Sequence, residues 1–177
     1  YLIAGTKRID LRQEIEKELR RKEKNKQNKE KIKEIRFREI GFADKKDIDK
    51  QLKLKKSRYT ASNGTEYFLE IVNKDNILFG LLRLRVQKEG KKNKRYREAI
   101  IRELHVYGKA LEIGKKAQRE NMQHKGLGKW LMQEAEKIAK KQKCNKIKII
   151  SGVGVREYYR KFGYKLGGEG VYMEKYL

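Results

Sequence analysis

The segment from Ala99 to Ser151 constrains the fold more than any other part of the sequence. Its pattern predicts a strand (Ala99 to Val106), a loop, a helix (Leu127 to Lys141) and a second strand (Lys146 to Ser151). The apolar positions of the helix are Leu131, Met132, Ala135, Ile138 and Ala139. A strand, helix and strand that share one sheet imply a parallel pairing. We therefore expect an α/β fold.

The residues before this segment predict antiparallel strands. Asn63-Gly64 favours the positive φ angles of a type I′ turn, so residues 58–62 and 65–72 should form a hairpin. The strand 77–86 begins Ile-Leu-Phe-Gly-Leu-Leu, which is too apolar for an exposed face and predicts a central place in the sheet. Alternating apolar and charged residues from Ile35 to Ile40 predict a further strand.

The C-terminal residues complete the expected sandwich, a mixed central sheet flanked by helices. They predict a short helix from Arg156 to Lys161 and strands near Tyr164 and from Val171 to Met173.

A helix should begin near Leu11, because Leu11, Ile15 and Leu19 recur at helical spacing after Asp10. Its far end becomes strongly basic, and we interpret it as a linker or solvated helix, with contact to nucleic acid as the more specific alternative. The basic positions between 20 and 38 are Arg20, Arg21, Lys22, Lys24, Lys26, Lys29, Lys31, Lys33, Arg36 and Arg38. We expect this extension to cover residues 1–34 and the folded domain to cover residues 35–177.

The net charge of +24, from 48 Lys and Arg against 24 Asp and Glu, favours a polyanionic partner. The competing interpretation is a lysine-rich composition that serves only solubility. Cys144 is the only cysteine, so a disulfide within the chain and a cysteine-bound metal are excluded, and we expect no metal site and a cytoplasmic location. No stretch approaches the ~20 apolar residues of a membrane span.

The loop from Gln123 to Gly128 opens directly into the predicted helix. Glycines let the main chain approach phosphate oxygens, and the unpaired amides and dipole of a helix start favour an anion. Lys125 and Lys129 add positive charge beside it. The alternative is that Gly126 and Gly128 serve only the geometry of the turn.

The spacing Gln-x-x-Gly-x-Gly resembles the pyrophosphate loop of the GNAT acetyltransferases, in which acetyl-coenzyme A lies between two splayed parallel strands. The resemblance implies that the strand ending Leu104-His105-Val106 pairs with the pantetheine and holds the thioester carbonyl, and that the strand from Lys146 diverges from it. The implied coenzyme-binding residues are Leu104, His105, Val106, Gln123, His124, Lys125, Gly126, Leu127, Gly128, Lys129 and Tyr158.

Further motifs resemble the catalytic subunit of Elongator and span nearly the whole chain. They are Ser151 to Tyr164, Arg102 to Gly108, Ile9 to Leu19, Ile35 to Gly41, Glu66 to Leu69 and Gly80 to Arg85. Members of that family usually carry a radical S-adenosylmethionine domain with an iron–sulfur motif upstream, and this sequence contains no such region. Many relatives also carry metal-binding cysteines at the junction, whereas residues 31–41 here contain none.

Tyr158 and Tyr159 fall in the short helix that, in the GNAT fold, faces the coenzyme sulfur, where a phenol can protonate a departing thiolate. The alternative for both is aromatic packing. His105 and Glu103 share one face of their strand, so His105 is a third catalytic candidate, although a hydrogen-bonded structural histidine is the competing interpretation. Cys144 has no neighbouring His, and we expect it to be an inert packing residue.

The resemblance implies transfer of an acetyl-derived group from acetyl-coenzyme A to the wobble uridine of tRNA. We expect tRNA contacts at Arg20, Arg21, Lys22, Lys24, Lys91, Lys92 and Lys94. The alternatives are a protein or histone lysine N-acetyltransferase and a noncatalytic tRNA-binding module. Other Elongator-type subunits, or a second copy of the chain, remain candidate partners.

Overall fold

The structure is a computed structural model that describes residues 10–24, 34–43, 48–87, 97–108, 126–168 and 170–177. It divides into two compact units, Tyr1–Arg38 and Glu39–Leu177. Whether these units are separate domains, with the boundary after residue 34 that the sequence suggested, stays a prediction. No helix in the described ranges is long and apolar enough to cross a membrane.

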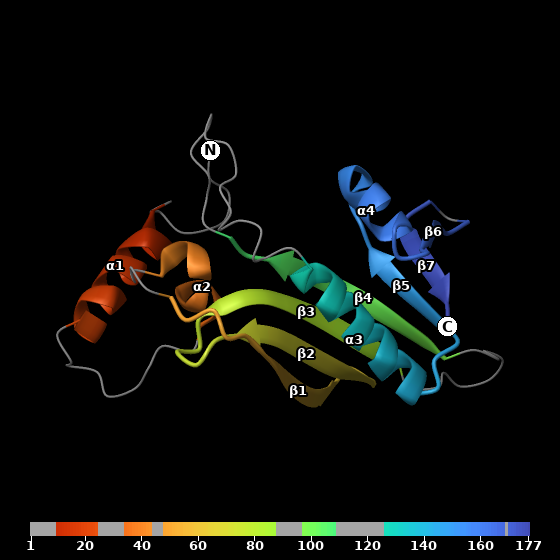
Figure 1. The fold of residues 1–177 in the computed structure, drawn as a ribbon, viewed down its shortest axis with the longest axis horizontal. Coiled ribbons are helices and arrows are strands. Elements are labelled where there is room, and N and C mark those ends of the chain that lie inside the picture. Colours follow the sequence, from red (N-terminus) through yellow and green to blue (C-terminus); the bar gives the residue numbers. More distant parts are fainter. Residues whose placement is uncertain (1–9, 25–33, 44–47, 88–96, 109–125, 169) are drawn as a thin grey trace. The chain divides into compact units, whose positions relative to one another are not determined.

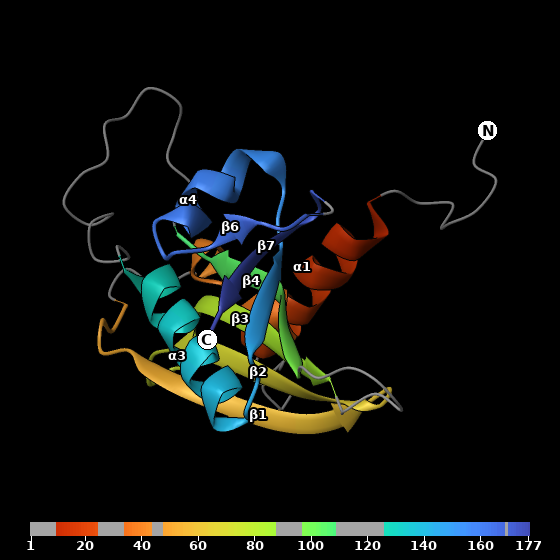
Figure 2. The same ribbon diagram turned by 90° about the vertical axis from the view of Figure 1, so that its right-hand side faces the viewer.

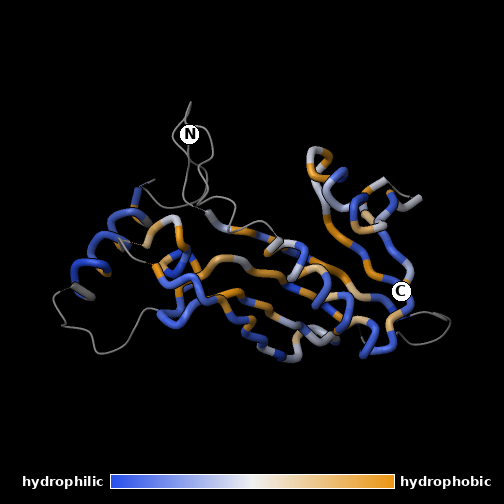
Figure 3. Tube along the Cα trace, viewed as in Figure 1, coloured by the Kyte–Doolittle hydropathy of each residue, from blue (hydrophilic) through white to orange (hydrophobic). Residues whose placement is uncertain are grey.

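The first unit contains the expected helix, α1 (Leu11–Lys24), and a single helical turn, α2 (Ile35–Arg38). α1 is almost entirely hydrophilic (Figure 3), and Leu11 and Ile15 of its apolar stripe remain exposed. The guanidinium of Arg20 lies 5.0 Å from the ring centre of Phe37. This cation–π contact links the two helices.

The strand predicted from Ile35 to Ile40 is wrong. α2 occupies its first part, and the 3₁₀ helix η1 (Ile40–Phe42) follows after Glu39. The carboxylate of Glu34 accepts a hydrogen bond from the backbone N–H of Phe37 at 3.1 Å. A side-chain acceptor at this spacing satisfies a free amide of a first helical turn and so favours the turn over an extended chain.

The second unit is built on a seven-stranded sheet with the order β1-β2-β3-β4-β5-β7-β6. All neighbours are antiparallel except β4 and β5, which are parallel as predicted. The strands are β1 (Lys53–Ala61), β2 (Gly64–Val72), β3 (Leu78–Gln87), β4 (Glu98–Val106), β5 (Lys146–Ile150), β6 (Lys165–Leu166) and β7 (Tyr172–Tyr176). The helices are α3 (Leu127–Lys141), the 3₁₀ turn η3 (Val153–Val155) and α4 (Arg156–Arg160).

The hairpin between β1 and β2 confirms the prediction, but its turn lies one residue earlier. Ser62 and Asn63 have the positive φ angles, 43° and 58°, and Ala61 pairs with Gly64. Gly64 begins β2 instead of completing the turn. A Cβ there would lie 2.9 Å from the guanidinium of Arg85, so the lack of a side chain admits the arginine.

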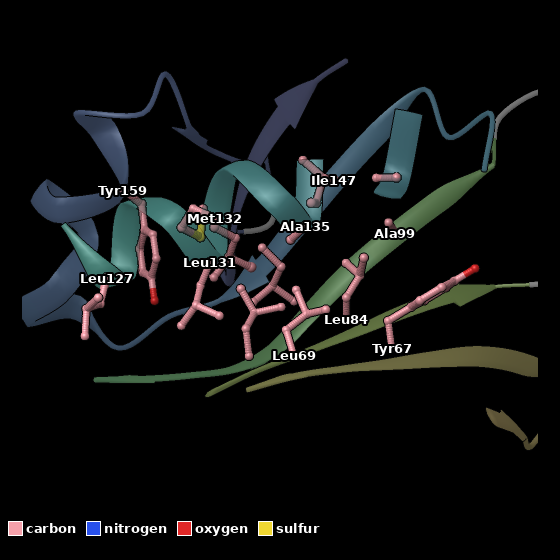
Figure 4. Packing of buried hydrophobic residues seen from close by; sticks show 14 of the residues in the cluster. Tyr67, Leu69, Leu84, Ala99, Leu127, Leu131, Met132, Ala135, Ile147 and Tyr159 are labelled. Carbon is pink, nitrogen blue, oxygen red and sulfur yellow. The ribbon is translucent and has the colours of Figure 1, made fainter. Parts of the chain in front are cut away.

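The core of this unit lies between the sheet and α3, whose bounds agree with the prediction. α3 lies along one face of the sheet and contacts β3 and β4 (Figures 1 and 2). Figure 4 shows Leu131 and Ala135 on the side of α3 that faces Leu69 and Leu84. Gly80 in β3 allows the close approach, because a Cβ there would lie 3.3 Å from a methyl group of Leu131.

Strand β4 contains a bulge at Arg102. Glu103 pairs with Arg83 and Ile101 pairs with Leu84, so Arg102 is an extra residue relative to β3. The parallel ladder with β5 ends at the same place, since its last pair is Ile101 with Ile149. A bulge increases the local twist of a strand. β4 therefore leaves β5 where the bulge begins.

Candidate coenzyme site

The edge of β4 after the bulge has no strand beside it among the described residues. The β4–β5 ladder covers residues 98–101 of β4, whereas the strand continues to Val106 along β3. Main-chain groups on an unpaired edge can hydrogen-bond an extended ligand in the manner of a neighbouring strand. The backbone of Leu104, His105 and Val106 lies on this edge, as the predicted pantetheine contact requires.

A buried carboxylate anchors the bulge. Glu66 in β2 is 2% exposed, and its Oε1 lies 3.0 Å from Nη1 of Arg102 and 2.8 Å from Nη1 of Arg85. Charge-assisted contacts of this kind hold a side chain more firmly than neutral hydrogen bonds do. The bulged residue is thus tied across β3 to β2, and the direction in which β4 leaves the sheet is fixed by this cluster.

The start of α3 faces the same region. Gly126 is its N-cap, with φ of 102°, and among the described residues no side chain caps the helix. The first helical bond runs from the Trp130 N–H to the Gly126 carbonyl at 2.8 Å. The amides of residues 127–129 therefore have no partner within the helix, and the positive end of the helix dipole favours an anion beside them. Lys129 is exposed next to these amides.

Gly128 is the point where three elements converge. A Cβ at this position would lie 3.5 Å from Cγ2 of Val106 in β4 and would overlap the hydroxyl of Tyr158 in α4. Gly128 itself and its neighbour Leu127 are buried. The start of α3, the free end of β4 and a phenol hydroxyl thus meet within contact distance, and a methyl group at position 128 would have to displace that hydroxyl.

The two adjacent tyrosines of α4 have different surroundings. Tyr158 is 37% exposed and Tyr159 is 7% exposed, with the ring of Tyr159 packed in the core near the start of α3 (Figure 4). Burial raises the pKa of the Tyr158 hydroxyl and of the Tyr159 hydroxyl. Both phenols therefore keep their protons at neutral pH. The hydroxyl against Gly128 belongs to Tyr158, and a catalytic role for either residue stays a prediction.

His105 lies on the other face of β4 from this convergence. Side chains alternate along a strand, so His105 points away from the α3 face that Val106 contacts. Its Nε2 is 3.2 Å from Glu103, which in turn lies 3.5 Å from Arg83. The imidazole is 54% exposed and stacks on Tyr107 with ring centres 6.0 Å apart. The side chain is held beside the Glu103–Arg83 ion pair, while its backbone stays on the free edge.

Several predicted basic and loop residues are partly engaged or lie outside the description. In α1, Arg20 pairs with Glu16 at 2.8 Å and Arg21 pairs with Glu18 at 2.9 Å. Lys22 is 3.9 Å from Glu18, and Lys24 is the last residue of the helix. The predicted residues outside the described ranges are Lys91, Lys92, Lys94, Gln123, His124 and Lys125.

Two further observations concern metal binding and thiol chemistry. Within the described ranges, no group of three or more His, Cys, Asp or Glu side chains is placed to hold a metal ion. Cys144 is buried at the end of α3, and burial raises the pKa of its thiol, which makes the reactive thiolate scarcer.

Sequence patterns did not predict that Glu66, Arg85 and Arg102 support the site. One signal was present, since a carboxylate in an otherwise apolar strand requires a buried partner. The partner could not be chosen from sequence, because Arg85 and Arg102 become neighbours of Glu66 only through the register of three strands.

Comparison with known proteins supports the fold and the resemblance. Residues 30–164 match the model of the acetyltransferase (GNAT) family. The chain is 42% identical over 156 residues to Elongator complex protein 3 of Schizosaccharomyces pombe, and the match covers 82% of this chain and 27% of that protein. It is 43% identical over 151 residues to the tRNA uridine(34) acetyltransferase of Methanocaldococcus jannaschii, with 81% and 27% covered.

Structural comparison gives the same result. The archaeal Methanocaldococcus infernus Elp3 with an N-terminal deletion superposes with a TM-score of 0.71 and 39% identity, over 92% of this chain and 38% of that one. This chain thus spans about a quarter of the length of the curated relatives it matches. The predicted mixed sheet flanked by helices and the resemblance to Elongator catalytic subunits are confirmed, and the chain belongs to the acetyltransferase (GNAT) family.

Proposed function

We propose that this chain binds acetyl-coenzyme A and forms the acetyl-donor part of an enzyme that modifies the wobble uridine of tRNA in the cytoplasm. The observation that carries the proposal is the convergence at Gly128 of an uncapped helix start, a free strand edge and a phenol hydroxyl. The names of its relatives, which include tRNA uridine(34) acetyltransferases, supply the substrate class.

The described residues fit the coenzyme. The amides of residues 127–129 and the charge of Lys129 suit a pyrophosphate, and Gly126 leaves open space where a side chain would stand. The free edge of β4 from Arg102 to Val106 suits the amides of a pantetheine arm. Bound there, acetyl-coenzyme A would supply the acetyl group as a thioester.

Tyr158 is the residue best placed to manage a proton at this site. Its Oη lies beside Val106 at the free edge of β4, along which the pantetheine arm would lead to the thioester, whose departing sulfur requires a proton. Because burial raises its pKa, the hydroxyl holds its proton at neutral pH and can donate it. Tyr159 would support it from the core, where the two rings pack edge to face with centres 5.4 Å apart.

The charge of the chain favours tRNA over a protein acceptor. Lysine-bearing protein tails are cationic, and a chain of net charge +24 would repel them while attracting RNA. This is the reason for placing a protein lysine N-acetyltransferase second. A noncatalytic tRNA-binding module comes third, since it gives no reason for Gly128 to be kept free of a side chain beside Tyr158.

Calorimetric titrations with acetyl-coenzyme A, desulfo-coenzyme A and tRNA, separately and together, test the proposal. We expect both coenzyme forms to bind, tRNA to bind with steep salt dependence, and release of free coenzyme A from acetyl-coenzyme A to increase when tRNA is added. Binding of tRNA without any coenzyme binding would favour the noncatalytic module. Coenzyme binding without tRNA binding at low salt would favour the protein acetyltransferase.

A further inference from the structure

An open cleft of about 400 Å³ lies at the opposite end of α3 from the coenzyme site. Its walls are β1, the edge strand of the sheet, and the C-terminal half of α3. Four cationic side chains line it, two from each wall, and one carboxylate. They are Lys56, Arg58, Lys137, Lys141 and Glu134. The lining side chains therefore carry a net charge of 4 − 1, or +3.

The single carboxylate does not neutralise the cleft. Glu134 lies 2.5 Å from the ammonium of Lys56 and 3.9 Å from that of Lys137, so its charge is shared by two lysines. Within the described ranges, Arg58 and Lys141 have no ion-pair partner. Two cations with no carboxylate beside them thus face an open concave surface, where an anion would have little competition.

Arg58 is positioned by the core. Its guanidinium lies 6.0 Å from the ring centre of Tyr67, which is 9% exposed and belongs to the hydrophobic core. A cation over an aromatic face retains its outward N–H donors, and a guanidinium pairs well with phosphate oxygens through two of them. Arg58 therefore keeps donors free for an anion while its guanidinium lies near the ring of Tyr67.

The cleft is separate from the coenzyme site. Lys137 and Lys141 follow Gly128 by nine and thirteen residues along α3, which at ~1.5 Å per residue is roughly 14 to 20 Å. The end of a helix also carries the negative pole of its dipole, which repels anions. An anion in the cleft must therefore be held by side-chain charge. Lysines are common in the last turn of a helix because they compensate the dipole, but that reason does not explain the two cations of β1.

We propose that this cleft binds the phosphate backbone of RNA and forms a second RNA contact at the far end of α3 from the acetyl donor. The inference rests on the proposed function, because it takes tRNA as the ligand. Cations on two walls suit a chain that bears a charge at every repeat, and the edge position of β1 leaves the cleft accessible along its length. An RNA held in this cleft while its uridine meets the acetyl group would be fixed in direction as well as in place.

The test compares two triple variants of equal charge change. The cleft variant is Arg58→Ala/Lys137→Ala/Lys141→Ala, and the control is Lys50→Ala/Lys161→Ala/Lys165→Ala, whose lysines are exposed elsewhere. The probe is one unmodified tRNA transcript, titrated between 50 and 200 mM salt, values chosen for the assay. We expect the slope of log K against log salt to become less negative by about 2 in the cleft variant, and by much less in the control. Acetyl-coenzyme A should bind both variants as it binds the parent.

Three outcomes would overturn the inference. One is an equal change in both variants, which would show only a general effect of charge. Another is an unchanged slope in the cleft variant. The third is binding of an oligoglutamate with the same dependence on the cleft residues, which would show a site for any polyanion. Failure of the proposed function is distinct, because the parent itself would then bind no coenzyme or no tRNA.

A second cleft variant guards against loss of folding. Lys137→Ala/Lys141→Ala leaves β1 and the packing of Arg58 on Tyr67 intact, and both lysines are exposed on α3. We expect it to change the slope by more than one unit, at about 0.7 to 0.9 per lost phosphate contact. An unchanged slope in this folded variant would also contradict the inference.

Discussion

The two ends of α3 are both suited to anions, but by different means. At the start of the helix, the groups that face the ligand are backbone amides, and a side chain at position 128 would meet the hydroxyl of Tyr158. At the far end, the groups are four side chains, Lys56, Arg58, Lys137 and Lys141. Their positive charges must attract an anion although the negative pole of the helix dipole repels it. One site depends on the shape of the main chain and the other on the number of charges.

This difference predicts how each end responds to change. A main-chain site is destroyed by one added side chain, and salt affects it moderately because few ions are displaced. A side-chain site loses affinity in steps, one cation at a time, and depends steeply on salt. Substitutions at the two ends of α3 test this contrast.

Gly128→Glu should reduce acetyl-coenzyme A affinity by more than about a hundredfold, or about 2.7 kcal/mol, because its side chain would enter the space between Val106 and Tyr158 and bring a negative charge beside the amides that face the pyrophosphate. Calorimetry measures the affinity, and circular dichroism checks the fold. tRNA binding should persist, since the cleft is unaffected. A folded variant that binds coenzyme like the parent would show that the start of α3 is not the phosphate site.

Gly128→Ala offers a finer version of this test. The methyl group overlaps the Tyr158 hydroxyl but would lie 3.4 Å from its Cζ, so removal of the hydroxyl should relieve the conflict. We expect Gly128→Ala to weaken coenzyme binding and the double variant with Tyr158→Phe to recover part of it. The coupling between the two changes is measured by a double-mutant cycle. Additive effects would mean that the two groups do not meet in solution.

Tyr158→Phe should slow thioester cleavage in the presence of tRNA by about 10² to 10⁴, the usual range for a general acid, with coenzyme affinity retained. Tyr159→Phe should have a smaller effect, since that ring lies in the core. The exposed Tyr59→Phe is a matched control. Equal rates in all single variants and in the Tyr158→Phe/Tyr159→Phe double variant would identify both tyrosines as packing residues.

The pH profile provides an independent check on Tyr158. A proton donor acts while it is protonated, and burial raises the pKa of this phenol above its ordinary value of about 10. The part of the rate that depends on Tyr158 should therefore stay level through neutral pH and fall only above about pH 10. A fall of that part of the rate near pH 7 would assign the proton transfer to another group.

The basic residues of α1 should contribute less to the salt slope than those of the cleft. Arg20 and Arg21 already pair with Glu16 and Glu18, so an RNA phosphate would have to compete with these carboxylates. We expect Arg20→Ala/Arg21→Ala to change the slope by less than one unit and Arg58→Ala/Lys141→Ala to change it by more, from ~0.7 to 0.9 per contact. The reverse order would make α1 the main RNA contact.

Substitutions in contact with the middle of α3 should change the stability of the fold but not the binding of coenzyme or tRNA. Glu136 accepts hydrogen bonds from Tyr164 at 3.0 Å and from Lys175 at 2.9 Å. Tyr164→Phe should reduce the free energy of unfolding by about 1 kcal/mol at pH 7, measured in urea. Binding of coenzyme and tRNA should not change.

The same tyrosine should make the fold sensitive to alkali. Burial and the neighbouring Glu136 carboxylate raise the pKa of Tyr164 strongly. Its stabilising contribution is complete below the ordinary tyrosine pKa of about 10 and decreases as the pH rises from there towards the raised value. Tyr164→Phe should therefore lose less stability than the parent between pH 9 and 11, chosen to bracket that ordinary pKa. An identical decrease in both proteins would contradict this assignment.

The parts of the fold that sequence predicted are those governed by local patterns. The apolar face of α3 repeats over four turns and gave its bounds, and the apolar run at the start of β3 gave its central place. The segment from Ile35 to Ile40 failed because six residues of alternating character also fit a helical turn once Glu34 caps it. The hairpin turn was shifted because Asn63 can take a positive φ with either neighbour.

The candidate site was predicted only where it is contiguous in sequence. The glycines at 126 and 128 predicted an anion-binding site at a helix start. The contact of Gly128 with Tyr158 could not be predicted, because it joins residues that are far apart along the chain. The cleft was missed for the same reason, since β1 and α3 become neighbours only in the folded sheet. Charge composition indicated a polyanion but not where it would bind.

The bulge at Arg102 also affects how related sequences should be aligned. Before the bulge, the core-facing residues are Ala99 and Ile101, and after it they are Leu104 and Val106. The inward-facing side chains therefore stand at odd positions before the bulge and at even positions after it. Deletion of this one residue would remove the bulge and leave His105 on the outer face, whereas a strand that kept Arg102 in regular pairing, without the bulge, would turn His105 towards α3. An alignment gap placed a few positions away would therefore exchange inward and outward residues at the end of β4, and would compare the wrong side chains between otherwise similar proteins.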